Sequence, residues 1–290
     1  MKKKYFNLVT LDSPIRNSDF PAAMESIIID SHGSKLNGLI YIAPGSGPHP
    51  TAILLHGFPG NERNLDLAQA IRRAGWNAVY FNYRGSWGSE GDYLLQNAVE
   101  DTQVIIEYLH SDKAKDYRID PETIALIGHS MGGAYAFAAA IQDSSVKYIA
   151  SLAGINLGAI CRLIQNNPIA FENIKTRLEN VAGPLVGFNG KSFLNDLIAN
   201  QDQYDVKTNA KVLASKNVLI VGALRDETAN PNIHYWPIFQ ALQAENANQL
   251  THEVFDDDHS FSSHRIALAR LVVLWLKRAI PAYEITVPGQ

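Results

Sequence analysis

Short apolar runs alternate along the chain with longer segments whose apolar residues recur every three or four positions. A short unbroken apolar run is typical of a strand buried on both faces, whereas the second pattern indicates an amphipathic helix. Strands are predicted at 26–30, 36–43, 51–56, 77–83, 123–128, 146–154, 217–223 and 250–256, and helices at 62–75, 93–111, 132–142 and about 262–280. Strands that alternate with helices predict an α/β fold, with a mostly parallel sheet of the eight-stranded type and helices on both faces.

The alternation breaks between Ile155 and about Val212, where several short helical patterns are separated by Pro168 and Pro184. A segment of this length is too long for a simple connection in a compact domain. We therefore expect a core formed by residues 1–154 and 213–290, with a helical cap inserted at 155–212.

Composition and charge exclude several classes of protein. Of the 290 residues, 46% are hydrophobic and 19% are charged, so a sizeable core is available and global disorder is excluded. The formal net charge of -4 gives no basic face for a nucleic acid, and Lys2 to Lys4 are interpreted as a solvated terminus. No apolar run reaches 18 residues, so the sequence predicts no membrane span.

The single cysteine, Cys161, cannot form an intrachain disulfide, which fits a reducing compartment. The opening stretch of the chain resembles a signal peptide superficially, but its apolar part is short and ends at Asp12 and Pro14. We therefore expect a mature N-terminus and a cytoplasmic protein.

The sequence GHSMG at 128–132 places Ser130 between a predicted strand and a predicted helix. This is the strand–turn–helix context in which a G-x-S-x-G turn exposes a nucleophilic serine. Glycine at 128 and 132 fits a sharp turn, because larger side chains would strike the neighbouring strand and helix. The alternative is a tight turn in which Ser130 caps the following helix.

A serine hydroxyl needs a base, and the base needs an acid that orients it. Asp226 follows the predicted strand 217–223, at the same sheet edge as Ser130, with Glu227 as its competitor. The alternative interpretation of Asp226 is a loop acid that caps the helix after Pro231.

His259 follows the last predicted strand and precedes the final helix, where it could serve as the base. His264 is predicted to lie inside that helix and to point away, and His252 lies within the strand. Alone, His259 would be interpreted as an exposed loop histidine. Its place after Ser130 and Asp226, at the same sheet edge, favours catalysis.

An acyl-transfer site also needs donors for the developing oxyanion. We expect one from the backbone N–H of Met131, directly after the nucleophile. The other is expected from the loop HGFPG at 56–60, where Phe58 is the candidate and His56 shapes the loop.

Five segments together resemble the α/β-hydrolase superfamily: LLHGFPGN, FNYRGSWGSEG, LIGHSMGG, LIVGALRDETANP and DDHSFSSHR. They occur in the family's order and cover roughly residues 25–154 and 215–280. The resemblance implies Ser130 as nucleophile, Asp226 as acid, His259 as base and no cofactor or metal. It also implies that Arg84 shapes a loop under the site. The finer pattern looks like small carboxylesterases, feruloyl esterases and prolyl-oligopeptidase-like hydrolases.

Three functions are consistent with these residues. The first is a carboxylic ester hydrolase that acts on a small-molecule ester through an acyl-enzyme. The second is a peptidase or amidase with an acidic anchor among Glu172, Glu179 and Asp196. The third is a non-catalytic binding protein that kept the fold.

The substrate pocket is expected between the cap and the strand edge, because ligands bind at this edge of open α/β sheets. Its candidate lining residues are Trp87, Phe188 and Trp236, and ordinary packing is the alternative for each. The sequence leaves open whether the protein is a monomer or a homodimer.

Overall fold

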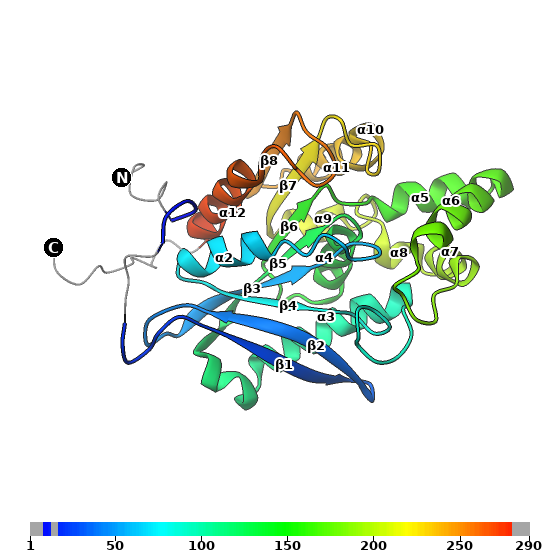
Figure 1. Ribbon diagram of the computed structural model, residues 1–290. Coiled ribbons are helices and arrows are strands. Elements are labelled where there is room, and N and C mark those ends of the chain that lie inside the picture. Colours follow the sequence, from blue (N-terminus) through cyan, green and yellow to red (C-terminus); the bar gives the residue numbers. More distant parts are fainter. Residues whose placement is uncertain (1–7, 13–16, 280–290) are drawn as a thin grey trace.

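The computed structural model describes residues 8–12 and 17–279 (Figure 1). Eight strands form one sheet in the order β1-β2-β4-β3-β5-β6-β7-β8. β1 and β2 pair antiparallel, as do β2 and β4, and all other neighbouring strands are parallel. The strands are β1 (Ala23–Ser31), β2 (Ser34–Ile42), β3 (His49–Leu55), β4 (Asn77–Phe81), β5 (Ile119–His129), β6 (Tyr148–Leu152), β7 (Asn217–Ala223) and β8 (Leu250–Phe255). The predicted α/β fold is confirmed.

The ends of the strands differ from the prediction where polar residues interrupt the apolar pattern. β5 begins at Ile119 rather than at 123, because pairing of Ile119 with His49 extends the strand across a shift in register. β4 ends at Phe81, since the next residue, Asn82, turns its side chain into hydrogen bonds with Asn37 and Tyr80.

Helices cover both faces of the sheet (Figure 1). On one face α2 (Leu65–Arg73) and α12 (Arg265–Ala279) bury a cluster that includes Trp275. On the other face α3 (Leu95–His110) and α4 (Met131–Gln142) pack against the strands, joined by α9 and α11. The remaining helices are α5 (Leu157–Ile164), α6 (Pro168–Val181), α7 (Gly190–Ala199), α8 (Gln201–Tyr204), α9 (Ala210–Ala214), α10 (Pro231–His234), α11 (Trp236–Ala244) and the 3₁₀ helix η1 (Asp112–Tyr117).

Helix α4 is buried on nearly all sides, because ten of its twelve residues are buried. Its sequence, MGGAYAFAAAIQ, supplies small side chains that let the helix approach β5 and β6 closely. This packing fixes the start of α4, and therefore Ser130, relative to the sheet.

Helices α5 to α9 occupy the connection between β6 and β7, and α5 and α6 project from one end of the molecule (Figure 1). The side chains of Asn156, Asn167 and Asn189 accept hydrogen bonds from the first turns of α5, α6 and α7. Asparagine is favoured at this position because it satisfies a free backbone N–H. These three asparagines explain where the helices begin.

Two backbone hydrogen bonds tie the middle of this connection to the loop after β4. The N–H of Val186 donates to Gly85, and the N–H of Tyr93 donates to Val186. None of the helices formed by the described residues is long and apolar enough to cross a membrane. Lys2 to Lys4 lie outside the described residues.

Candidate active site

Ser130 occupies a strained turn between β5 and α4. Its φ of 58° and ψ of -122° are unusual for a residue with a side chain, and such strain is typical of functional turns. A Cβ at Gly128 would lie 2.0 Å from the Gly132 oxygen, and one at Gly132 would lie 2.1 Å from the Leu55 oxygen. Both positions therefore require glycine. The Ser130 side chain makes no capping hydrogen bond to α4.

The structure brings Ser130, His259 and Asp226 together from three loops at the carboxyl edge of the sheet. The Nε2 atom of His259 lies 2.9 Å from the Oγ of Ser130, and its Nδ1 lies 2.7 Å from Oδ2 of Asp226. A carboxylate can only accept a hydrogen bond, so Nδ1 carries the proton and Nε2 accepts from the serine hydroxyl. This is the tautomer in which an imidazole can remove the serine proton.

Asp226 is buried, and its side chain has no exposed surface. Burial alone would raise its pKa, but the hydrogen bond and charge of His259 outweigh that effect. The backbone N–H groups of Thr228 and Ala229 also donate to Oδ1. The pKa of Asp226 is therefore lowered, and the carboxylate stays ionised to hold the imidazole.

The rival residues lie elsewhere. Glu227 is exposed. His264 precedes α12 rather than lying inside it, and its Nδ1 lies 2.9 Å from the Oδ2 atom of Asp257. His252, on β8, lies within hydrogen-bond distance of the Tyr235 hydroxyl.

The loop at 56–60 lies directly against the serine. A Cβ at Gly57 would be 2.8 Å from the Cβ of Ser130, so glycine is needed for this approach. The loop is anchored from below, because His56 Nδ1 lies 2.8 Å from the Gly57 oxygen. Burial lowers the pKa of His56 to about 4, so its ring is neutral. Phe58 follows Gly57, and Met131 opens α4, where backbone N–H groups have no partner within the helix.

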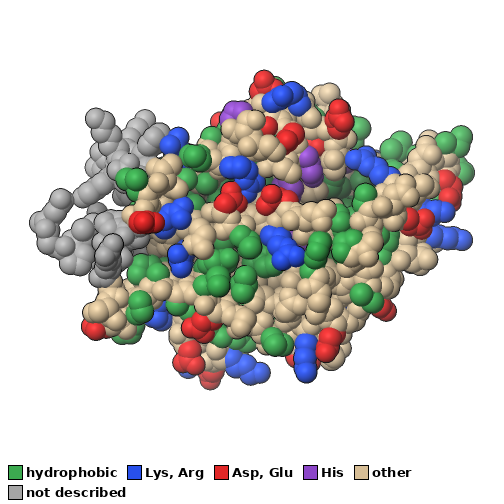
Figure 2. Space-filling model, viewed as in Figure 1, with side chains coloured by type: hydrophobic (Ala, Val, Ile, Leu, Met, Phe, Trp, Pro, Cys, Tyr) green, Lys and Arg blue, Asp and Glu red, His purple; other side chains and the backbone are tan. Residues whose placement is uncertain are grey.

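A hollow of about 180 Å³ opens beside Ser130. On the face shown in Figure 2, acidic and basic side chains gather where α2 and α12 approach each other, close to surface histidines. The hollow is lined by Gly57, Phe58, Pro59, Gly60, Asn61, Glu62, His129, Ser130, His259 and Ser260. Ser130 and His259 are thus both accessible from one space.

The three aromatic residues predicted to line a substrate pocket are not among the residues that line this hollow. Trp87 supports the loop instead, because its indole N–H donates to the Pro59 oxygen at 2.6 Å. The ring of Phe188 packs 4.9 Å from the ring of Phe58. Trp236, on α11, packs against Tyr235 and Phe239.

Sequence reasoning missed His129, the residue before the serine. It is buried, its Nε2 lies 2.8 Å from the carbonyl oxygen of His259, and its ring centre lies 4.9 Å from the His259 ring. The available signal was a histidine directly before the serine in the motif GHSMG. Its hydrogen-bond partner, His259, is distant in the sequence and could not be identified from it.

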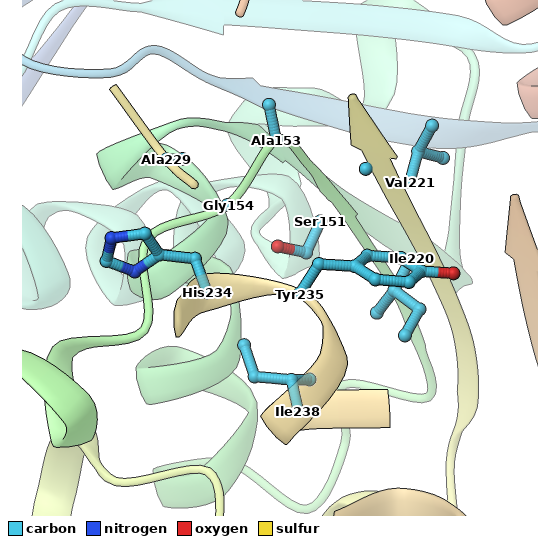
Figure 3. Close-up of a pocket in the computed structure, with 10 residues that line it drawn as sticks. Ser151, Ala153, Gly154, Ile220, Val221, Ala229, His234, Tyr235 and Ile238 are labelled. Atoms are coloured by element: carbon cyan, nitrogen blue, oxygen red, sulfur yellow. The ribbon is translucent and has the colours of Figure 1, made fainter. Parts of the chain in front are cut away.

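His234 was also missed. Its Nδ1 accepts a hydrogen bond from the N–H of Asn156 at 3.0 Å, which links α10 to the residue that caps α5. Burial lowers the pKa of His234 to about 4. Beneath it lies a cavity of about 10 Å³, lined by Ser151, Gly154 and Tyr235 among others (Figure 3), which is room for one water. None of its lining residues belongs to the predicted site.

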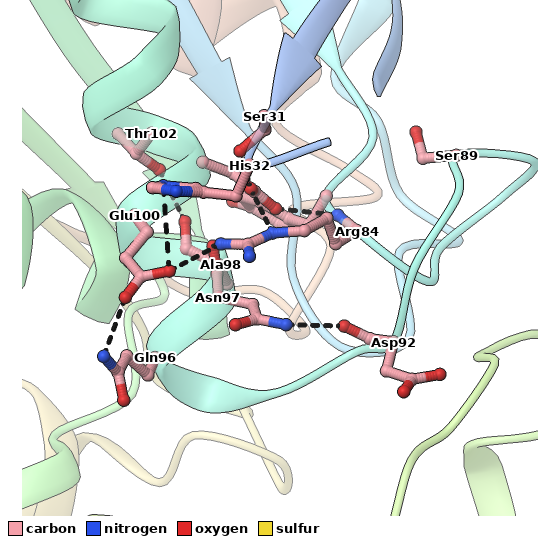
Figure 4. Close-up of polar contacts among 12 residues, drawn as sticks. Ser31, His32, Arg84, Ser89, Asp92, Gln96, Asn97, Ala98, Glu100 and Thr102 are labelled. Atoms are coloured by element: carbon pink, nitrogen blue, oxygen red, sulfur yellow. Dashed lines mark hydrogen bonds and ion pairs between the residues drawn. The ribbon is translucent and has the colours of Figure 1, made fainter. Parts of the chain in front are cut away.

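Arg84 does not line the hollow, and its side chain holds the loop after β4 (Figure 4). Its Nε donates to Asp101 at 2.6 Å and its Nη2 to Glu100 at 2.7 Å. The Ser31 hydroxyl donates to the same Asp101 oxygen at 2.6 Å. The arginine therefore ties this loop to α3 and to the end of β1.

Within residues 8–12 and 17–279, no group of three or more His, Cys, Asp or Glu side chains is arranged to hold a metal ion.

A family model described as the alpha/beta hydrolase family matches residues 52–271. A 31.7 kDa protein encoded in the traX–finO intergenic region of Escherichia coli is 37% identical over 113 residues, which are 38% of this chain and 39% of that protein. The chain thus aligns with well under half the length of this relative.

Solved structures with the same fold include enzymes of two kinds. An acylaminoacyl peptidase from Pyrococcus horikoshii matches with a TM-score of 0.64 at 18% identity, over 91% of this chain and 42% of that chain. The esterase Pf2001 of Pyrococcus furiosus matches with a TM-score of 0.62 at 16% identity, over 92% and 97% of the two chains. At these identities the likeness concerns the fold.

Proposed function

The chain belongs to the alpha/beta hydrolase family, and from this premise we propose that it is a serine hydrolase that cleaves carboxylic esters. The observation that carries the proposal is the unbroken pair of hydrogen bonds from Ser130 to His259 and from His259 to Asp226. This arrangement activates a hydroxyl that is otherwise a weak nucleophile.

The proposed reaction has two halves. His259 removes the Ser130 proton as Oγ attacks the ester carbonyl, and the protonated imidazole then gives that proton to the departing alcohol. Water, deprotonated by His259, attacks the acyl-enzyme and releases the carboxylic acid and the free serine. Asp226 stays ionised throughout and stabilises the imidazolium.

The backbone N–H groups of Phe58 and Met131 are the proposed donors for the oxyanion of each tetrahedral intermediate. The close approach of Gly57 to Ser130 supports this role for the loop. Residues 155–212 are proposed to form a cap that closes one side of the acyl site. The packing of Phe188 and Phe193 around the Phe58 ring supports the cap, and Phe188 remains a proposed contact for the acyl group.

Amide hydrolysis is the alternative for the same residues, and it requires an anchor for a substrate amine. Two of the acids considered for this role have other partners, because Glu172 pairs with Lys175 and Asp196 binds Asn200. We therefore favour esters. Turnover of aminoacyl-p-nitroanilides that exceeds turnover of matched p-nitrophenyl esters would reverse this preference.

The test is hydrolysis of p-nitrophenyl butyrate by wild type and by Ser130→Ala, together with labelling by a fluorophosphonate. We expect wild type to turn over the ester and to gain the mass of the probe less HF on Ser130, because fluoride is the leaving group. We expect Ser130→Ala to do neither while it unfolds at the wild-type temperature. Equal rates for the two proteins would exclude Ser130 as nucleophile, and a wild type inert to both reagents would favour a binding protein.

A further inference from the structure

The hollow beside Ser130 carries one charged group of its own. Of the ten described residues that line it, Glu62 is the single carboxylate, and none is a lysine or an arginine. The other polar side chains besides Ser130 and the two histidines are those of Asn61 and Ser260. Glu62 thus adds a negative charge to a wall of mixed polar and apolar residues that also includes His259.

Glu62 shares its neighbouring cation, Arg265, with Asp66, and Arg265 lies closer to Asp66. Its Oε1 accepts a hydrogen bond from the N–H of Asn64 at 2.6 Å, which fixes the side chain. Arg265 lies 4.0 Å away, but Asp66 already binds its guanidinium at 2.9 and 2.5 Å. Arg63 lies with its guanidinium carbon 4.8 Å from the centre of the Trp87 ring. The negative charge therefore stays available at the hollow.

The proposed reaction decides which part of a substrate meets this wall. The leaving oxygen must receive its proton from Nε2 of His259, so the leaving group has to lie on the side that His259 and Ser260 form. The rings of Phe188 and Phe193, which surround Phe58, suit an apolar acyl group instead. A hollow of about 180 Å³ has room for a small alcohol.

We infer that the hollow is a leaving-group site and that Glu62 selects esters of small alcohols that carry an ammonium group. This inference rests on the proposed ester hydrolysis and names its substrate class. The products are a carboxylic acid and an amino alcohol, with water supplying the hydroxyl of the acid and the proton of the alcohol.

A pair of butyrate esters with leaving groups of equal shape tests the inference. 2-(Dimethylamino)ethyl butyrate is cationic at pH 7, and 3-methylbutyl butyrate replaces its N–H⁺ by C–H. We expect wild type to prefer the cationic ester in kcat/KM. We expect Glu62→Gln, which keeps the shape and the acceptor for Asn64, to lower the cationic-to-neutral ratio about five- to tenfold. That size fits one charge pair about 4 Å apart that is screened as strongly as in bulk water.

Asp256→Asn is the matched control, because it removes one negative charge from an exposed residue that pairs with Arg225 outside the hollow. We expect it to keep the wild-type ratio, and we expect 0.5 M NaCl to lower the ratio of wild type. A wild type without preference, or an equal change in both variants, overturns the inference. A wild type that cleaves neither these esters nor p-nitrophenyl butyrate overturns the proposed function itself.

Discussion

The Nε2 atom of His129 lies 2.8 Å from the carbonyl oxygen of His259, although 130 residues separate the two histidines. A carbonyl oxygen only accepts, so His129 must donate from Nε2. Burial and the nearby His259 lower the pKa of His129 to about 4, which keeps the ring neutral above pH 5. A buried, neutral ring thus fixes the backbone of the proposed base from the residue that precedes the proposed nucleophile.

We expect His129→Phe to lower kcat at least tenfold and to leave KM for p-nitrophenyl butyrate within twofold. The reason is that the base loses its backbone anchor, and small displacements of catalytic groups are costly. His129→Gln keeps a donor and should recover most of the rate. Steady-state kinetics on both variants provide the measurement. A loss that scales only with the fraction of folded protein would instead assign His129 a purely structural role.

Gly57 and Gly183 offer a second test, because a methyl group meets different surroundings at each. At Gly57 it would lie 2.8 Å from the Cβ and 3.3 Å from the Oγ of Ser130, whereas at Gly183 nothing lies within 4 Å. We expect Gly57→Ala to lower kcat/KM at least tenfold, since the methyl group displaces the serine or the loop. Gly183→Ala should have the wild-type kcat/KM in the same assay. A fully active Gly57→Ala would contradict this expectation, because it would show that the loop can move to accommodate the methyl group.

The apolar runs and the helical periodicity were enough to predict the order of strands and helices, because most of the parallel strands contain a buried apolar run. β8, with the sequence LTHEVF, is the exception. The helix cluster after β6 was likewise predictable from short helical patterns separated by Pro168 and Pro184. Ser130, Asp226 and His259 could be placed at one edge because each follows a strand of a parallel sheet.

Contacts between distant loops could not be predicted in this way. Trp87 was interpreted as a substrate contact, yet its indole N–H bonds to Pro59, since the loop after β4 folds beneath the loop after β3. Glu62 was not predicted as a site residue, because only the packing of α2 against α12 brings it near Arg265 and the hollow. The pattern of residues along the chain does not show which distant segments come into contact.

Arg84 should be far more important for stability than an exposed cation. Burial raises the pKa of Asp101 despite the hydrogen bonds from Ser31 and Arg84, so this carboxylate depends on its partners. Arg84→Met would leave it without its cation, and removal of one partner from a buried pair costs about 3–5 kcal/mol. Urea unfolding of Arg84→Met measures the loss, with Lys115→Ala as control because Lys115 pairs with Asp112 in solvent. We expect no change for the control, and a loss below 1 kcal/mol for Arg84→Met would contradict this role.

Four buried histidines should make the protein sensitive to mild acid: His56, His129, His234 and His49, whose pKa is also lowered by burial. Burial lowers the pKa values of His56, His129 and His234 from 6.5 to about 4 each. Well above pH 6.5 each ring is neutral in the folded and the unfolded chain, so none of them affects the pH dependence of stability. Between pH 6.5 and 4 the unfolded chain binds protons that the folded chain does not, so stability falls as the pH falls.

The slope of this loss reports how many protons are involved. One proton corresponds to about 1.4 kcal/mol per pH unit, so the three histidines with a pKa of about 4 give at most about 4 kcal/mol per pH unit near the middle of the window, and His49 adds to this slope. Urea unfolding at pH 7.5, 6.5 and 5.5 measures the slope, and His129→Gln should reduce it by about one proton, because glutamine does not titrate. The lowered pKa of Asp226 acts only below about pH 5, as the unfolded carboxylate begins to bind protons there. A free energy of unfolding that stays constant from pH 7.5 to 5.5 would mean that these rings accept protons without opening the fold.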